Sequence, residues 1–166
     1  MDEKQQEMIL KKELNLPPEY YYNDDKPEED AAIINDTWQY SVKGDYRSIL
    51  QMLPNVIIRC QGQPVAYEMF SPNGCFQHHF VHEEHRRRGL GKHVELPRKS
   101  YSQTLKMSVF RDGIWPCKTV EQRNKLVIAW SDRSPNWNRL NDECGNPIII
   151  NFSPVICVNT SELKYT

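Results

Sequence analysis

The segment Arg86 to Lys92, RRRGLGK, constrains this chain more than any other, because it holds four basic residues and two glycines in seven positions. An alternating apolar run precedes it and a helix-like segment follows it. Backbone N–H groups at a helix N-terminus are unpaired and lie at the positive end of the helix dipole. Gly89 and Gly91 permit the tight turn that brings such donors close to a ligand. The segment therefore predicts an anion-binding strand-to-helix junction, with a pyrophosphate as its natural guest.

Two familiar phosphate-binding loops are excluded by their own spacing. A P-loop needs the pattern G-x-x-x-x-G-K-[ST], but His93 follows Gly91-Lys92 and Arg86 occupies the position of the first glycine. A dinucleotide-binding turn needs G-x-G-x-x-G, and Val94 occupies the position of the third glycine. The strands predicted before the segment are also hairpins, whereas a dinucleotide fold begins with a βαβ unit.

The residues around this junction predict a mixed α/β sheet. DDKPEEDAAIINDTW has helix-favouring acids at its start, and Ala31, Ile34 and Trp38 lie on one face at helical spacing. A second helix, DYRSILQML, ends at Pro54. Three strands with turns between them form an antiparallel meander, namely NVIIRC, PVAYEMF and CFQHHFV. After the junction we expect a helix toward Leu105, a strand at MSVF, a helix at about 120–130, and late strands at IIINF and PVICV. The order is helices, an antiparallel meander and then β-α-β-α-β.

The junction resembles the acyl-CoA loop of GCN5-related N-acyltransferases (GNATs), whose pattern [RQ]-x-x-G-x-[GA] matches Arg86 to Gly91. More of the chain, from about Asp30 to Phe152, is similar to the C-terminal domain of glycine N-acyltransferase-like proteins. The further matches are Ile34-Asn35 with Trp38, Gly62 with Pro64-Val65 and Tyr67, and Gly74 placed fifteen residues before Gly89.

This resemblance implies a GNAT-type fold in which two parallel strands splay apart to hold acyl-CoA as a co-substrate, without a metal. The pantetheine arm would pair with the backbone of the first of these strands, and the pyrophosphate would lie on the N–H groups of the loop. A later helix would supply an asparagine. The cofactor-binding residues expected on this basis are His79, Phe80, Val81, Arg86, Arg87, Arg88, Gly89, Leu90, Gly91, Lys92 and Asn124. The reaction implied is transfer of the acyl group to the amine of glycine, another amino acid or a similar small acceptor.

The catalytic base is where the chain departs from the family. The glycine-conjugating enzymes carry a glutamate directly after the hairpin glycine, and here that position is Cys75. Strict alternation along the strand places Cys75 and His79 on one face, so these two are the candidate catalytic residues. The nearby alternatives are Glu68, His78 and Glu83.

Other interpretations stay open beside the enzyme. The chain could be an acyl-CoA-binding module that has lost catalysis, or a non-catalytic interaction domain in which Arg86 to Arg88 contact phosphates. The five histidines lie between His78 and His93, but HEEH is one residue short of a zinc-binding HExxH, so a metal is not expected. Three arginines without interleaved aromatic residues are weak evidence for nucleic acid. Trp130 to Pro147 could be a cover for the acceptor site or an ordinary surface loop.

Length and charge set the remaining expectations. The 166 residues fit one domain at 26–160, preceded by a polar lead-in at 1–25 and followed by a tail at 161–166. The net charge of −1 selects neither nucleic acid nor a membrane, and no apolar run approaches the length that a bilayer needs. Five widely spaced cysteines without a C-x-x-C indicate reduced thiols. We expect a cytoplasmic monomer or weak dimer, since no presequence is seen, with a mitochondrial location as the alternative that the resemblance implies.

Overall fold

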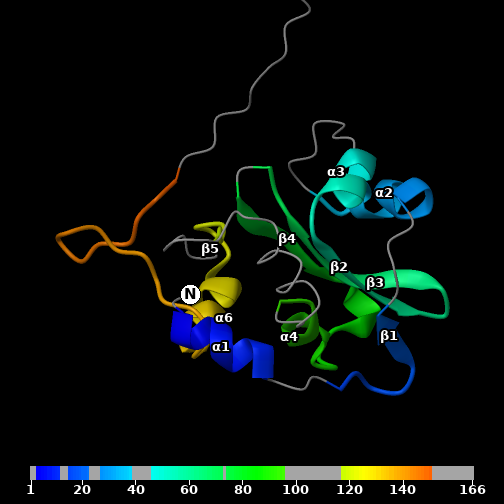
Figure 1. Ribbon diagram of the computed structural model, residues 1–166, viewed down its shortest axis with the longest axis horizontal. Coiled ribbons are helices and arrows are strands. Elements are labelled where there is room, and N and C mark those ends of the chain that lie inside the picture. The colour runs from blue at the N-terminus through cyan, green and yellow to red at the C-terminus, as the bar shows by residue number, and fades with distance from the viewer. Residues whose placement is uncertain are drawn as a thin grey trace, which may run out of the picture.

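A computed structural model describes residues 3–11, 15–22, 27–38, 46–72, 74–95 and 117–150. They form one five-stranded sheet in the order β1-β2-β3-β4-β5 (Figure 1). The first four strands pair antiparallel, and β5 pairs parallel to β4. The strands are β1 (Tyr20–Tyr22), β2 (Asn55–Cys60), β3 (Gln63–Phe70), β4 (Cys75–Val81) and β5 (Cys117–Lys118). The predicted mixed α/β sheet, with an antiparallel meander before a parallel strand, is confirmed.

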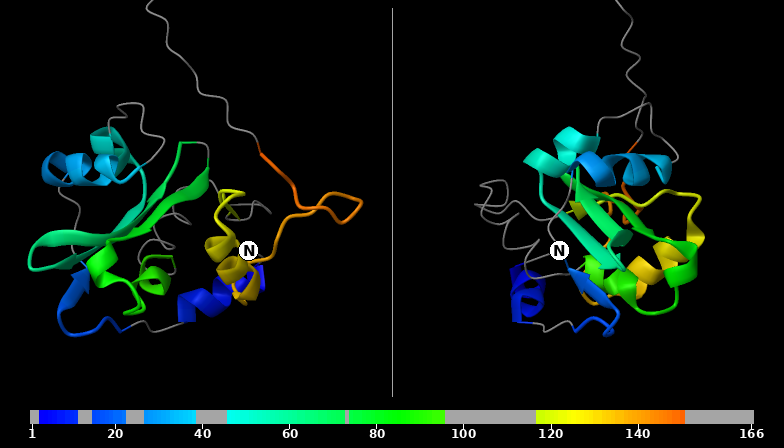
Figure 2. Two further views of the ribbon diagram at one scale, coloured as in Figure 1. Left: turned by 180° about the vertical axis from the view of Figure 1, so that it is seen from behind. Right: turned by 90° about the vertical axis from the view of Figure 1, so that its right-hand side faces the viewer.

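Helices cover both faces of the sheet (Figure 2). On one face lie α2 (Pro27–Asp36) and α3 (Tyr46–Met52), and on the other lies α4 (Leu90–Glu95), which follows the 3-10 turn η1 (Glu83–His85). The helices α1 (Glu3–Lys11) and α6 (Lys125–Arg133) lie beside α4 on that second side. Alternate residues of β2 supply the two cores, because Ile57 packs with the α2–α3 side and Ile58 with Leu90 and Val94 of α4.

A buried ion pair joins α2 to the β2–β3 hairpin. The guanidinium of Arg59 donates to both carboxylate oxygens of Asp30, at 3.1 and 2.6 Å, and to the carbonyl of Gly62 at 3.2 Å. Both charged side chains are only 1% exposed. Such a bidentate contact fixes the orientation of α2 as well as its distance from the sheet.

A bulge in β4 changes which residues share a face. The register of β3 against β4 shifts between Tyr67 and Met69, and His78 has a φ of +53°. As a result Phe76, before the bulge, and His79, beyond it, lie on one face against Trp137 and Trp130, whereas Phe80 lies against Tyr67 on the α2–α3 side. Strict alternation, which placed Cys75 and His79 on one face, is therefore wrong, because the extra residue of a bulge reverses the alternation beyond it.

Several predicted elements begin or end elsewhere. Within the lead-in expected at 1–25, Tyr20 is buried and its strand β1 extends the sheet. Ile148 to Ile150, predicted as the start of a strand, are exposed and have no strand assignment. The structure describes the helix α4 as far as Glu95. The strands expected at MSVF and PVICV, and the rest of the helix toward Leu105, lie outside the described residues.

The burial of His78 predicts a pH-dependent stability. Its Nε2 lies 3.0 Å from the hydroxyl of Thr37, with the rings of Trp38, Tyr46 and Tyr67 around it, and burial lowers its pKa to about 4. An unfolded histidine titrates near 6.5, so the unfolded chain takes up this proton first. We expect the free energy of unfolding to fall by about 2–3 kcal/mol from this group as the pH drops from 6.5 toward 4.

Urea unfolding at pH 7 and pH 4.5 measures this effect, with His78→Gln as the comparison. The drop in stability between the two pH values should be smaller in the variant by about that amount. An equal drop in both proteins would mean that His78 is not the titrating group.

Candidate functional site

The sheet opens between β4 and β5. The two strands pair at only two positions, Cys75 with Cys117 and Phe76 with Lys118. One further bond runs from the N–H of Thr119 to the carbonyl of Phe76, at 3.4 Å. Within the described part of the chain, the remainder of β4 after Phe76 has no strand partner on this side. A strand edge presents backbone donors and acceptors with which an extended ligand can pair.

Four buried charged side chains meet where the strands separate, and we call them the charge cluster: Glu68 of β3, His79 of β4, Glu95 of α4 and Lys118 of β5. His79 Nδ1 lies 3.6 Å from Glu68 Oε1, and Lys118 Nζ donates to Glu95 Oε1. The carboxylates are at most 4% exposed and the lysine 10%, whereas His79 keeps 25% of its side chain exposed. His79 is thus the member of the cluster that solvent or a substrate can reach.

Two indole rings cover the charge cluster. Lys118 Nζ lies 4.9 Å from the ring centre of Trp130 and 4.8 Å from that of Trp137, and Trp130 is tilted against His79 with 5.5 Å between ring centres. Aromatic rings at these distances attract a cation and exclude water from its surroundings. These two tryptophans belong to the segment Trp130 to Pro147 and lie directly over the charged groups.

The electrostatics favour the protonated form of His79. Burial alone would lower the pKa of His79, but the carboxylates of Glu68 and Glu95 outweigh it and raise that pKa above its ordinary value. Burial also raises the pKa of Glu95, against the opposing effect of Lys118. Groups whose pKa values are displaced by burial and by specific partners, gathered beside an opening, are candidates for proton transfer.

The glycine-rich loop is adjacent to the charge cluster. A Cβ added at Gly91 would lie 3.2 Å from Nε2 of His79, so the absence of a side chain there leaves room for the imidazole. The predicted anion loop and the predicted catalytic histidine therefore form one site. A substitution at Gly91 would disturb both, which makes Lys92, exposed on the same turn, the better position for testing anion binding.

The loop is held in shape by its own arginines. Arg86 Nε donates to the carbonyl of Val81 at 3.0 Å, and Arg88 donates to Glu19 and to the carbonyl of Glu84, both at 3.4 Å. Leu90 is fully buried and anchors the first turn of α4 in the core. Arg87 and Gly89 adopt positive φ values of 61° and 81°, which turn the backbone at this point.

Asn124, expected near the cofactor, caps the N-terminus of α6. Its side-chain oxygen accepts the N–H of Val127 at 3.1 Å. This cap fixes the first turn of the helix that brings Trp130 over His79. The exposed Asn124 therefore has a structural role whether or not it also contacts a ligand.

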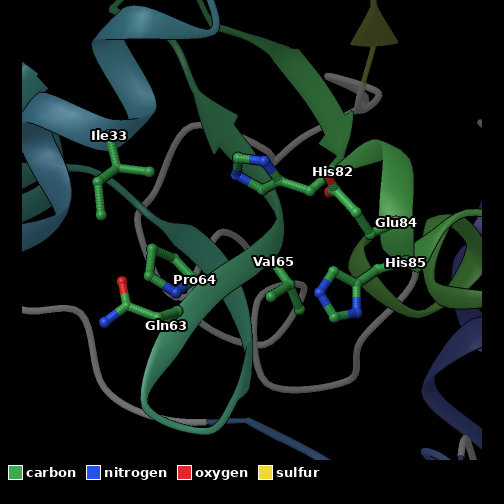
Figure 3. A pocket seen from close by; sticks show the side chains of 7 residues that line it. All are labelled: Ile33, Gln63, Pro64, Val65, His82, Glu84 and His85. Carbon is green, nitrogen blue, oxygen red and sulfur yellow. The ribbon is translucent and has the colours of Figure 1, made fainter.

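Three of the other histidines, His78, His82 and His85, are not at the charge cluster. His78 lies on the α2–α3 side, and His82 and His85 line a separate hollow with Ile33 and the start of β3 (Figure 3). Glu83 is exposed and pairs loosely with Arg86 at 3.9 Å.

Among the described residues there is no group of three or more His, Cys, Asp or Glu placed to hold a metal. None of the helices in the described ranges is both long and apolar enough to span a bilayer.

Sequence reasoning missed Glu95 and Lys118. Glu95 lies one helical turn after Gly91, so a helix beginning at the loop would have placed both on one face. No sequence pattern marks Lys118 in the same way. Its strand β5 is two residues long, and the residue that pairs with Lys118 in β4 is 42 positions earlier in the chain.

Comparisons with known proteins find structural neighbours at low sequence identity. No protein-family model and no curated protein matches the chain. Among solved structures, a Drosophila protein matches with a TM-score of 0.51 and 22% identity, over 59% of this chain and 35% of its own, so the chain spans about a third of that protein. A Xanthomonas campestris protein described as an acetyltransferase of the GNAT family matches with a TM-score of 0.44 and 16% identity, over 73% of this chain and 87% of its own.

Proposed function

We propose that this chain is a GNAT-type, acyl-CoA-dependent N-acyltransferase that acts on the amine of a small acceptor such as glycine or another amino acid. The observation that supports it most is the placement of His79. The histidine is paired with the buried Glu68, lies where β4 and β5 separate, and contacts the glycine-rich loop at Gly91. A base could take the proton of the acceptor amine, and an anion-binding turn could hold the pyrophosphate of coenzyme A.

The open edge of β4 and the loop would share the coenzyme. The N–H groups of 87–92 and the charges of Arg87 and Lys92 would bind the pyrophosphate, and the free backbone beyond Phe76 would pair with the pantetheine amides. A coenzyme bound in this way would have its thioester near His79, beside the ring of Trp130. The indole would then separate the reacting atoms from bulk water.

His79 would act as the base for the acceptor amine. A neutral amine attacks the thioester carbonyl, its surplus proton passes to His79, and the carbon–sulfur bond breaks to release coenzyme A as a thiolate, which takes up the proton from His79. Glu68 holds the imidazole and stabilises its protonated form. Cys75, in the position of the family's glutamate, is a poor base, because burial and the neighbouring Cys117 raise its pKa to about 12.

The partnership of His79 and Glu68 predicts a shifted pH profile. Acyl transfer needs neutral His79, so kcat/KM should rise as the pH passes upward through its pKa. Glu68 raises that pKa, and Glu68→Gln should therefore move the acidic limb of the profile to lower pH. Steady-state rates between pH 5.5 and 8.5 measure the shift. If the acidic limb of the profile stayed at the same pH in Glu68→Gln, a group other than His79 would be responsible for it.

Binding of coenzyme A is tested by calorimetry with acetyl-CoA and benzoyl-CoA on the whole chain. Lys92→Glu places a negative charge at the loop and should weaken binding at least tenfold, which corresponds to about 1.4 kcal/mol. Arg47→Glu is the matched control, because Arg47 is an exposed cation on α3, on the opposite face of the sheet. Equal weakening in both variants, or none, would contradict a coenzyme site at the loop.

A second candidate is a module that binds acyl-CoA without catalysis, and Cys75 in place of the family's glutamate favours it. Both candidates predict the same binding and differ in turnover. A non-catalytic domain that contacts phosphates through Arg86 to Arg88 would bind its partner without competition from coenzyme A.

A further inference from the structure

Two thiols lie against each other where β4 and β5 are paired. Cys75 and Cys117 are direct neighbours in the parallel register, and their sulfur atoms are 3.1 Å apart. Both are free thiols, with Cys75 buried and Cys117 half-buried. They are the sole pair of neighbouring thiols among the cysteines in the described ranges, where Cys60 and Cys144 lie elsewhere.

The backbone positions suit a covalent bond. Paired strands lie about 4.7–4.9 Å apart, inside the range of about 4.4–6.8 Å between the Cα atoms of bridged cysteines. The sulfur atoms need to approach by about 1 Å to reach a bond of about 2.05 Å, which small side-chain rotations supply. No strand has to leave the sheet for the bond to form.

We propose that Cys75 and Cys117 form a redox-active dithiol, which low-molecular-weight disulfides such as glutathione disulfide oxidise to an intramolecular disulfide between β4 and β5. The more accessible Cys117 reacts first. Its thiolate attacks one sulfur of the small disulfide, forms a mixed disulfide and releases one small thiolate, which takes up a proton. Cys75 then loses its proton, attacks the Cys117 sulfur and expels the second small thiol. The protein loses two electrons and two protons, and both small thiols gain them.

The local environment orders these two steps. Burial, together with the hydrogen bond and the charge of Cys117, raises the pKa of Cys75 to about 12, so Cys75 stays protonated in the reduced chain. Once Cys117 is in a mixed disulfide it no longer presents a negative charge, and that contribution is lost. Cys75 is therefore a better nucleophile after Cys117 has formed the mixed disulfide than it is in the reduced chain.

The bond would also affect the charge cluster. Lys118 follows Cys117 directly and holds Glu95, Trp130 and Trp137 through its ammonium group. A covalent bond at Cys117 fixes β5 to β4 and so restricts the freedom of the adjacent Lys118. If the chain transfers acyl groups as proposed above, the oxidised form should therefore turn over at a different rate from the reduced form, and this consequence alone rests on the proposed function.

Mass spectrometry of the folded chain in glutathione redox buffers tests the proposal. Oxidation should leave three of the five thiols open to alkylation and link Cys75 to Cys117. Trypsin leaves Cys60 and Cys75 in one peptide, so a second, glutamate-specific cleavage after Glu68 is needed to separate them. The Cys117→Ser variant should lose the link, whereas Cys144→Ser, the matched control, should keep it.

Three results would overturn the proposal. They are alkylation of both Cys75 and Cys117 after oxidation, a link from either one to Cys60 or Cys144, and a link that forms only in urea. A link found in a chain that shows no turnover would leave the dithiol standing and count against the acyltransferase, so the two proposals fail separately.

Discussion

Replacing His79 by glutamine is expected to lower kcat/KM for acyl transfer by about 10²- to 10⁴-fold, the usual contribution of a positioned general base. Glutamine keeps a polar side chain of similar length beside Glu68 and Trp130, but it cannot take up a proton at neutral pH. The affinity for acyl-CoA should change little, because the loop and the strand edge would provide most of the binding. Release of free thiol from acyl-CoA measures the rate, and calorimetry measures the affinity.

His82→Asn is the matched control for this substitution. His82 belongs to the same histidine-rich stretch but lines the separate hollow of Figure 3, so its replacement should leave the rate within about threefold. Comparable losses in both variants would indicate a general effect on the fold. An unchanged rate in His79→Gln would remove His79 as the base.

The largest effect on stability is expected from Asp30→Ala. The substitution leaves the Arg59 guanidinium, which is 1% exposed, without its carboxylate partner in the core. Removing one member of a buried ion pair costs about 3–5 kcal/mol, because the remaining charge stays desolvated. Urea or thermal unfolding followed by circular dichroism measures the change.

The double substitution Asp30→Leu with Arg59→Met is the informative comparison for that variant. It removes both charges together and should recover much of the lost stability, as apolar residues of similar volume do in place of other buried pairs. A loss below about 1 kcal/mol in Asp30→Ala would show that the guanidinium reaches water or another partner once the carboxylate is gone.

Local patterns in the sequence predicted much of the fold. The acids after Pro27 and the spacing of Ala31 and Ile34 predicted α2, and turn residues between apolar runs predicted the meander of β2, β3 and β4. These signals are short-range, since they depend on helix periodicity and on turn chemistry. The loop at Arg86 to Lys92 was predicted for the same reason, because its glycines and charges are contiguous.

The parts that escaped prediction depend on contacts between distant segments. The bulge at His78 reverses the faces of β4, and no residue in CFQHHFV marks its position. The charge cluster draws on β3, β4, α4 and β5, so Glu95 and Lys118 gain their meaning only when the sheet is assembled. Tyr20 looked like part of a polar lead-in because its strand is three residues long and its pairing partner, Cys60, is forty positions later.

The most direct test of the account is the release of free thiol from acetyl-CoA and benzoyl-CoA by the purified chain, with and without glycine and a panel of other amino acids. The account predicts thiol release that depends on the amine, rises with pH through the titration of His79 and is lost in His79→Gln. Binding of both thioesters without amine-dependent release would contradict it and leave a coenzyme-binding module in its place.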